Sequence, residues 1–186
     1  MSLNKMKMTT TIKEKRHTVS DYLKLGEGDP HQLINGELIA LGEPSPTYGH
    51  QEMAGDIFTQ IRIFLKEKPI GKVICAPMDV YFDENNAFQP DIIFVSNKKK
   101  HIIKNDGLHG APDMIIEIQS PSTSYYDLNV KKKIYEKYGV KELWIIDPLD
   151  NSVAGFENSN GNFVKTVSGK DKFISKILNL KITLEL

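Results

Sequence analysis

The sequence predicts an α/β, or α+β, protein in which helices flank a central β-sheet. Short apolar runs rich in β-branched residues, typical of buried strands, occur at 92–95, 114–118 and 141–147. Longer stretches at 50–68 and 124–138 repeat their apolar residues with a helical period. Because strand and helix patterns alternate along the chain with turn signals between them, a layered fold of both element types is expected.

The N-terminal part of the chain predicts a short helix and a hairpin. Residues 1–16 are rich in Lys, Met and Thr without periodicity, so a disordered segment is expected there, ahead of one domain over 17–186. Thr18-Val-Ser-Asp21 has the pattern of a capping box, which starts a helix. Asn35-Gly36 lies between apolar pairs and predicts an N-terminal β-hairpin with a type I′ turn, and Glu37 follows that turn directly.

The helix predicted from His50 to Lys68 carries an apolar stripe that includes Met53, Ile57 and Ile61. His50 extends this stripe at the N-terminal end of the helix. A histidine in that position is either a hydrogen-bonded core residue or a group that lines a pocket. The next stretch predicts two strands, 72–76 and 78–82, and the single cysteine, Cys75, is expected to be a buried, inert thiol in the first of them.

The remaining segments predict a loop and a second hairpin. Residues 96–110 are polar and basic, and they predict a solvated loop whose run of lysines, 98–100, is also a candidate for phosphate contacts. Beyond the strand at 141–147, the segments 152–156 and 162–167 predict a C-terminal β-hairpin across a turn rich in Asn and Gly.

Composition limits the class of protein. The chain has 24 Lys and Arg against 24 Asp and Glu, so no overall basic field attracts it to nucleic acid, and any such contact is expected to be local, weak or transient. No apolar run is long enough to cross a bilayer, so no membrane partner is expected. The lone cysteine excludes a disulfide framework. Together these features predict a cytoplasmic protein.

The strand at 114–118 contains a carboxylate within an apolar run. In a strand, residues two apart share a face, so Ile115, Glu117 and Gln119 are expected to point the same way. Burying an isolated carboxylate is costly, so Glu117 needs a cation or a metal if it is buried. The alternative is that Glu117 sits at a strand end and reaches solvent or a surface lysine. A second strand, 92–95, is preceded by another carboxylate, Asp91.

The helix at 124–138 carries a lysine on its apolar face. At 100° per residue, Lys131 falls among Leu128, Ile134 and Tyr135. A lysine there needs a partner, which is either Asp127 in a simple intrahelical ion pair or the Glu117 strand across the short connection. The residue pattern leaves both possibilities open.

The ordered combination of these motifs resembles a known family. Gln89-Pro90-Asp91, then APDMIIEIQSPST, then Asp127-x3-Lys131-x3-Tyr135-x3-Gly139-Val140 and KELWIIDP are similar to the Uma-type restriction endonuclease family of the PD-(D/E)XK nuclease superfamily. The hairpin that ends in Asn-Gly-Glu and the His50 helix also match, so the resemblance covers roughly 18–185. It implies a restriction-endonuclease-like core with a mixed central sheet.

The resemblance also implies roles for site residues. In the superfamily, the Asp of one strand and the Glu of the next hold a divalent metal, and a Lys two residues after that Glu assists catalysis. This chain departs from the pattern because Gln119 stands where that lysine is expected, which suggests that the lysine has migrated to the following helix as Lys131. The expected catalytic residues are therefore Asp91, Glu117, Gln119 and Lys131, with Asp91 and Glu117 as the ligands of Mg²⁺ or Mn²⁺ and with Glu37 and His50 lining the same pocket.

The function expected from the resemblance is a Mg²⁺-dependent endonuclease that hydrolyses phosphodiester bonds, with DNA as substrate. RNA or a nucleotide is an open alternative substrate. The alternative from another class is a non-catalytic module that binds nucleic acid or protein and keeps the nuclease fold, which Gln119 and the zero net charge favour. A homodimer is a further possibility, because a nuclease that cuts two strands uses two sites.

Overall fold

The computed structural model of the protein describes residues 16–26, 28–41, 47–119 and 125–184, and for 125–128 it describes the backbone alone. The predicted disordered segment, 1–16, lies outside these residues except for Arg16. The α-helices are α1 (Val19–Tyr22), α2 (Tyr48–Glu67) and α3 (Tyr125–Lys137), and the 3₁₀ helices are η1 (Leu23–Leu25) and η2 (Asn97–Ile102). No helix in the described part of the chain is long and apolar enough to span a membrane.

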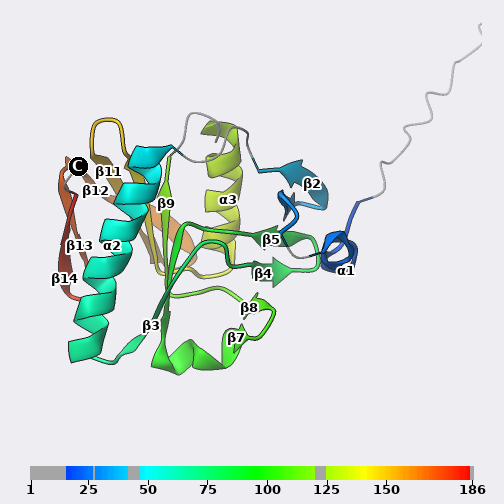
Figure 1. The fold of residues 1–186 in the computed structure, drawn as a ribbon, viewed down its shortest axis with the longest axis horizontal. Helices are drawn as coiled ribbons and strands as arrows, with labels where there is room; N and C mark the ends of the chain where they lie inside the picture. Colours follow the sequence, from blue (N-terminus) through cyan, green and yellow to red (C-terminus); the bar gives the residue numbers. More distant parts are fainter. Residues whose placement is uncertain (1–15, 27, 42–46, 120–124, 185–186) are drawn as a thin grey trace, which may run out of the picture.

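The strands form two large mixed sheets and a hairpin (Figure 1). The central sheet has the order β12-β11-β10-β9-β6-β3, with β9 parallel to β10 and the other neighbours antiparallel. Its strands are β3 (Gly71–Cys75), β6 (Ile92–Ser96), β9 (Met114–Ile118), β10 (Glu142–Asp147), β11 (Ser152–Ser159) and β12 (Asn162–Lys170). The predicted mixed central sheet is thus confirmed.

The second sheet has the order β2-β1-β5-β4-β8-β7, and a separate hairpin pairs the last two strands of the chain. The strands of the second sheet are β1 (His31–Ile34), β2 (Glu37–Ala40), β4 (Val80–Asp83), β5 (Asn86–Phe88), β7 (Ile103–Lys104) and β8 (Gly107–His109). The hairpin strands are β13 (Lys172–Ser175) and β14 (Leu180–Thr183). The predicted N-terminal hairpin is β1–β2, where Asn35 and Gly36 have the positive φ values that a type I′ turn requires.

Helices α2 and α3 cover opposite faces of the central sheet (Figure 1). Alternation along β9 sends Ile116 to the core beneath α2 and Ile115 to the core beneath α3. The α2 stripe is buried as predicted, and Thr47 caps the helix by accepting a hydrogen bond from the backbone N–H of His50. β9 is therefore covered on both faces, which explains its nearly continuous apolar sequence.

Two predictions about local structure were wrong. Residues 96–110 do not form an open loop, because they contain η2 and the short strands β7 and β8, and β8 extends the second sheet by pairing with β4. Strands of two or three residues are too short to show a period. Cys75 is exposed and not buried, because it ends β3, an edge strand of the central sheet.

Candidate functional site

The two carboxylates expected to act together lie at the same end of the neighbouring strands β6 and β9, Asp91 just before β6 and Glu117 near the end of β9. β6 and β9 are antiparallel, with Ile92 paired to Ile116 and Ile93 to Ile115. Continuing this register by one residue places Asp91 directly across from Glu117. Directly opposed residues on one face have Cβ atoms about 4.5–5.5 Å apart. The sheet itself therefore brings both carboxylates to the end of β9 that leads to α3.

Asp91 is fixed on both sides by backbone contacts. Its Oδ2 accepts a 2.7 Å hydrogen bond from the N–H of Ile118, the residue after Glu117. Its own carbonyl accepts a 2.9 Å hydrogen bond from the N–H of Ala76, which follows β3. Because one carboxylate oxygen is held by β9, the position of Asp91 relative to Glu117 is set by the central sheet.

The segment before Asp91 is anchored to the N-terminal helix. Gln89 donates a 3.0 Å hydrogen bond from Nε2 to Oδ1 of Asp79, and the same oxygen accepts a 2.7 Å hydrogen bond from the hydroxyl of Tyr22 in α1. Burial, followed by this bond to Asp79, raises the pKa of Tyr22, so the phenol remains a donor. Gln89 was predicted only as part of a motif, and its anchoring role comes from long-range contacts that no local pattern reveals.

His50 adjoins Asp91 from the other helix. Its Nε2 lies 3.4 Å from Oδ1 of Asp91, and the ring is buried at the start of α2. The contact with Asp91 raises the pKa of His50 above its usual value, although burial of the ring opposes this. Its other ring nitrogen, Nδ1, is buried and has no hydrogen-bond partner among the described residues. His50 thus lies beside Asp91.

Glu117 is almost fully buried and accepts a hydrogen bond from α3. The residue is 8% exposed, and its Oε1 accepts a 2.5 Å hydrogen bond from the hydroxyl of Tyr135. The alternative in which Glu117 reaches solvent is therefore wrong. Tyr135 was predicted only as part of the apolar face of its helix. A tyrosine on such a face, one turn from a buried lysine, was the signal that its hydroxyl meets a polar group.

Lys131 lies one turn before Tyr135 on the same face of α3, nearer to the loop that follows β9. Its side chain is 5% exposed, and Nζ lies 6.0 Å from the centre of the Phe88 ring. Phe88 stands three residues before Asp91. The predicted burial of this lysine is found, and its neighbour Phe88 belongs to the segment that leads to Asp91. The competing partner, the side chain of Asp127, lies outside the described residues.

Gln119 and Glu37 were also predicted to belong to the site. Gln119 follows β9 directly, is partly buried, and donates its backbone N–H to the carbonyl of Ile146. Glu37 is exposed and pairs with Ile34 at the β1–β2 turn, which lies beside the start of β5 at Asn86. Since β5 runs from there towards Asp91, Glu37 lies at the far end of that strand from the carboxylate pair.

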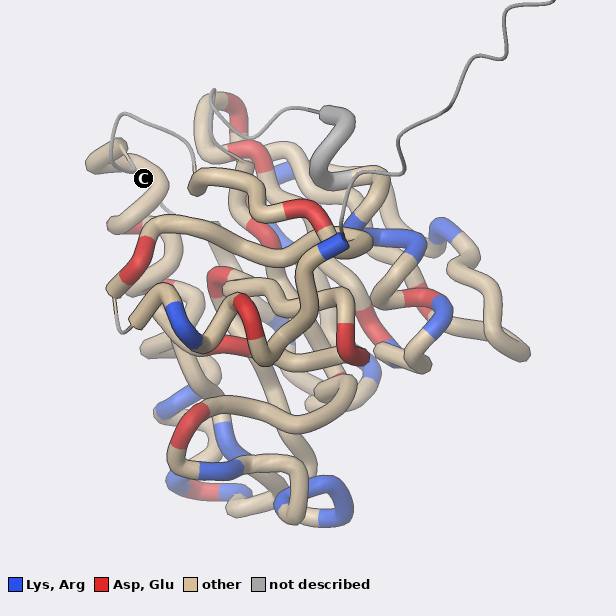
Figure 2. Tube along the Cα trace, turned by 90° about the vertical axis from the view of Figure 1, so that its right-hand side faces the viewer, with Lys and Arg blue, Asp and Glu red and all other residues tan. Residues whose placement is uncertain are grey.

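The basic run at 98–100 lies away from the carboxylates. It belongs to η2, which follows β6 at the end opposite Asp91, so the five residues of β6, about 16 Å at 3.3 Å per residue, separate the two. Figure 2 shows Lys and Arg segments gathered at the bottom of the molecule, the end at which η2 lies in Figure 1. Lys99 is partly buried and donates to the carbonyl of Ala111. This run does not extend the carboxylate site.

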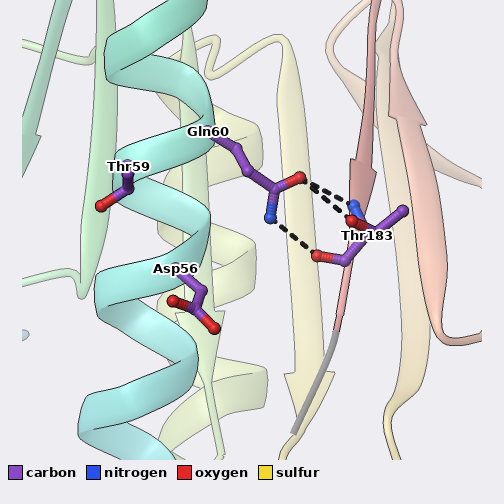
Figure 3. A pocket seen from close by; sticks show the side chains of 4 residues that line it. All are labelled: Asp56, Thr59, Gln60 and Thr183. Atoms are coloured by element: carbon purple, nitrogen blue, oxygen red, sulfur yellow. Dashed lines mark hydrogen bonds between the residues drawn. The ribbon is translucent and has the colours of Figure 1, made fainter.

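A depression elsewhere on the molecule has a structural explanation. It is lined by Asp56, Thr59, Gln60 and Thr183, between α2 and β14 (Figure 3). The amide of Gln60 donates 2.8 Å to the carbonyl of Thr183 and accepts 3.0 Å from its N–H. Gln60 therefore ties the last strand to α2 and is not available for a ligand.

The donors at the carboxylate site suit a hard cation. Among the described residues, no group of three or more His, Cys, Asp or Glu side chains is arranged to hold a metal ion by itself. Mg²⁺, however, usually takes one or two protein carboxylates and completes its shell with water and substrate phosphates. Asp91 and Glu117, one partly buried and one buried on opposed strand positions, meet this requirement.

Comparison with known proteins agrees with the topology. A solved structure described as a "putative nuclease belonging to DUF820" from Anabaena variabilis is 22% identical to this chain, with a TM-score of 0.74, and the match covers 90% of this chain and 94% of that one. It shows that the two share a fold. No curated protein matches the chain. The model of the Uma2 family, described as "Putative restriction endonuclease", matches residues 19–185, and the chain belongs to this family.

Proposed function

We propose that this chain is a divalent-metal-dependent endonuclease that hydrolyses phosphodiester bonds in DNA. The observation that carries the proposal is the register of β6 and β9, in which Ile92 pairs with Ile116, so that Asp91 and Glu117 are the next residues at that end of the pair. The burial of Lys131 supports it, because this lysine lies one helical turn before Tyr135, whose hydroxyl contacts Glu117. Membership of a restriction endonuclease family supports the choice of reaction.

Each residue has a distinct role in this proposal. Asp91 and Glu117 bind Mg²⁺ or Mn²⁺, which, when bound, neutralises charge on the phosphoryl oxygens and lowers the pKa of a bound water. Lys131 replaces the strand lysine of the superfamily and stabilises negative charge that develops on the phosphate. Its side chain is buried and its ammonium group lies over the Phe88 ring, so the charge is positioned before substrate binds. His50 holds the second carboxylate oxygen of Asp91.

The proposal is tested by incubating supercoiled plasmid with the protein in Mg²⁺, Mn²⁺ or EDTA. Nicked and linear products are expected with either cation and none in EDTA. Asp91→Asn and Glu117→Gln are expected to abolish cleavage. Asp106→Asn, at the exposed β7–β8 turn, is the matched control and should cleave normally. Cation-dependent cleavage that persists in both site variants would reject the assignment, and cleavage of RNA but not of DNA would correct the substrate.

One observation favours the non-catalytic alternative, a module that keeps the fold to bind nucleic acid. Gln119 offers an amide where a lysine is expected, and an amide carries no charge to stabilise a transition state. The same samples separate the two functions: retention of labelled DNA on a filter without cleavage in any cation supports the binding module. A homodimer remains a prediction, which light scattering would check.

A further inference from the structure

The hydroxyl of Tyr135 makes an unusually short hydrogen bond to Glu117, in addition to the packing of its ring. Its hydroxyl donates to Oε1 of Glu117 over 2.5 Å, within the short range of charge-assisted O–H···O⁻ bonds. Tyr135 is 0% exposed and Glu117 is 8% exposed. Water therefore competes little for this bond, and the low local dielectric strengthens it.

The ring that carries this hydroxyl is fixed by two neighbouring aromatic side chains. Phe82 lies with its ring centre 5.4 Å from that of Tyr135, and Phe88 meets the ring edge-on at 5.8 Å. Both distances fall within the range preferred by aromatic pairs. Because this packing restrains the ring, the position of the hydroxyl is restrained too, and its hydrogen bond holds Oε1 of Glu117 in place.

We propose that Tyr135 is a positioning residue that, by holding Oε1, orients the Glu117 carboxylate for the divalent cation. This inference rests on the proposed function. Groups that hydrogen-bond to metal-binding carboxylates fix their orientation and raise metal affinity. A carboxylate that offers one oxygen fits the octahedral shell of Mg²⁺ or Mn²⁺, whereas Ca²⁺ also takes carboxylates through both oxygens. Tyr135 therefore sets both the affinity and the choice of cation.

A purely structural role predicts different behaviour. If the hydroxyl only satisfies a buried carboxylate, its removal lowers thermal stability and leaves the relative affinities for cations unchanged. If it orients Glu117, its removal weakens Mn²⁺ binding and affects Ca²⁺ less, because Ca²⁺ accepts the alternative orientation. The ratio of the two dissociation constants is thus a readout that a structural role does not change.

The experiment compares Tyr135→Phe with Tyr138→Phe by calorimetric titration of the full chain, freed of metal, with Mn²⁺ and Ca²⁺. Tyr138 is the matched control, since it directly follows the same helix and its hydroxyl also donates to a carboxylate, that of Asp83. Tyr135→Phe is expected to weaken Mn²⁺ binding by about 10- to 100-fold. It should also reduce the preference for Mn²⁺ over Ca²⁺, while Tyr138→Phe changes neither. Circular dichroism of each variant without metal reports on folding.

Each remaining outcome overturns the positioning role. Wild-type Mn²⁺ affinity in Tyr135→Phe refutes it, and so does a variant that fails to fold, because the hydroxyl then serves the fold. Equal weakening for Mn²⁺ and Ca²⁺ also refutes it, because the ratio of the two dissociation constants is then unchanged, as a structural role predicts. If wild type binds Mn²⁺ and Glu117→Gln does not, these failures leave the proposed nuclease standing. If wild type binds no Mn²⁺, both proposals fall.

Discussion

Replacing Lys131 by methionine removes the ammonium group and keeps most of the stem that α3 buries. The side chain is 5% exposed, so the substitution alters the interior of the molecule. The lost cation–π contact with Phe88, at 6.0 Å, contributes about 0.5–2 kcal/mol. The free energy of unfolding is therefore expected to fall by roughly this amount.

The effect on catalysis should be much larger. Removing one preorganised group that stabilises transition-state charge costs about 10²–10³-fold in rate, or roughly 2.7–4 kcal/mol. Mn²⁺ affinity should stay the same or increase, because a positive charge near the cation is lost. Initial rates of plasmid nicking at saturating Mg²⁺, together with a Mn²⁺ titration, measure both quantities.

Lys133→Met is the matched control, since this lysine lies on the same helix and is exposed. It should cleave at the wild-type rate. A Lys131→Met variant that folds, binds Mn²⁺ and nicks DNA as fast as wild type would show that the lysine is structural. Reduced Mn²⁺ affinity would show instead that the ammonium group supports the carboxylates and not the phosphate.

Two further predictions concern stability. The side chain of Asp113 is 0% exposed, and its Oδ1 lies 2.6 Å from Nζ of Lys141. Burial alone would raise the pKa of Asp113, but hydrogen bonds from Lys141 and from the Ser96 backbone outweigh burial and lower this pKa. The lowered pKa stabilises the folded state above the unfolded-state pKa of about 3.9, and this stability is lost as pH falls through the lower folded-state pKa. Lys141→Met should therefore unfold in acid at a higher pH than wild type, which circular dichroism measures. In Gly155→Ala the new Cβ would lie 2.4 Å from a ring carbon of Trp144, which should lower the free energy of unfolding in urea by about 1–3 kcal/mol. Gly169→Ala is the control, because its Cβ would meet open space and the change should be nearly neutral.

Local patterns in the sequence were sufficient to predict the elements that bury long apolar faces. The α2 stripe, the Asn35-Gly36 turn and the burial of Lys131 follow from periodicity and turn chemistry, and the structure contains all three. Asp91 and Glu117 were each conspicuous as a carboxylate beside or within an apolar strand. That they lie opposite each other depends on strand pairing and register, which the resemblance to a family implied and the residues alone did not.

The features that sequence reasoning missed depend on contacts between distant segments. The hydroxyl of Tyr135 reaches Glu117 across 18 residues of chain, and a helical wheel records only that the ring faces inward. Cys75 has a strand-like context, yet its exposure follows from the position of β3 at the sheet edge. The strands β7 and β8 are too short to show alternation, and they form because β8 finds an unpaired edge of β4.

The anchoring of Gln89 through Asp79 to Tyr22 has a consequence for how the protein is made. Tyr22 is separated by 57 residues from Asp79 and by 67 from Gln89, so α1 leaves the ribosome long before its partners exist. Contacts of such high sequence separation form late in folding, after shorter loops have closed. Glu117 and its neighbour β10 are synthesised later still. A nascent chain that ends before β9 therefore cannot contain the carboxylate pair. The site becomes complete only after β9 has paired with β6 and the distant segments have folded together.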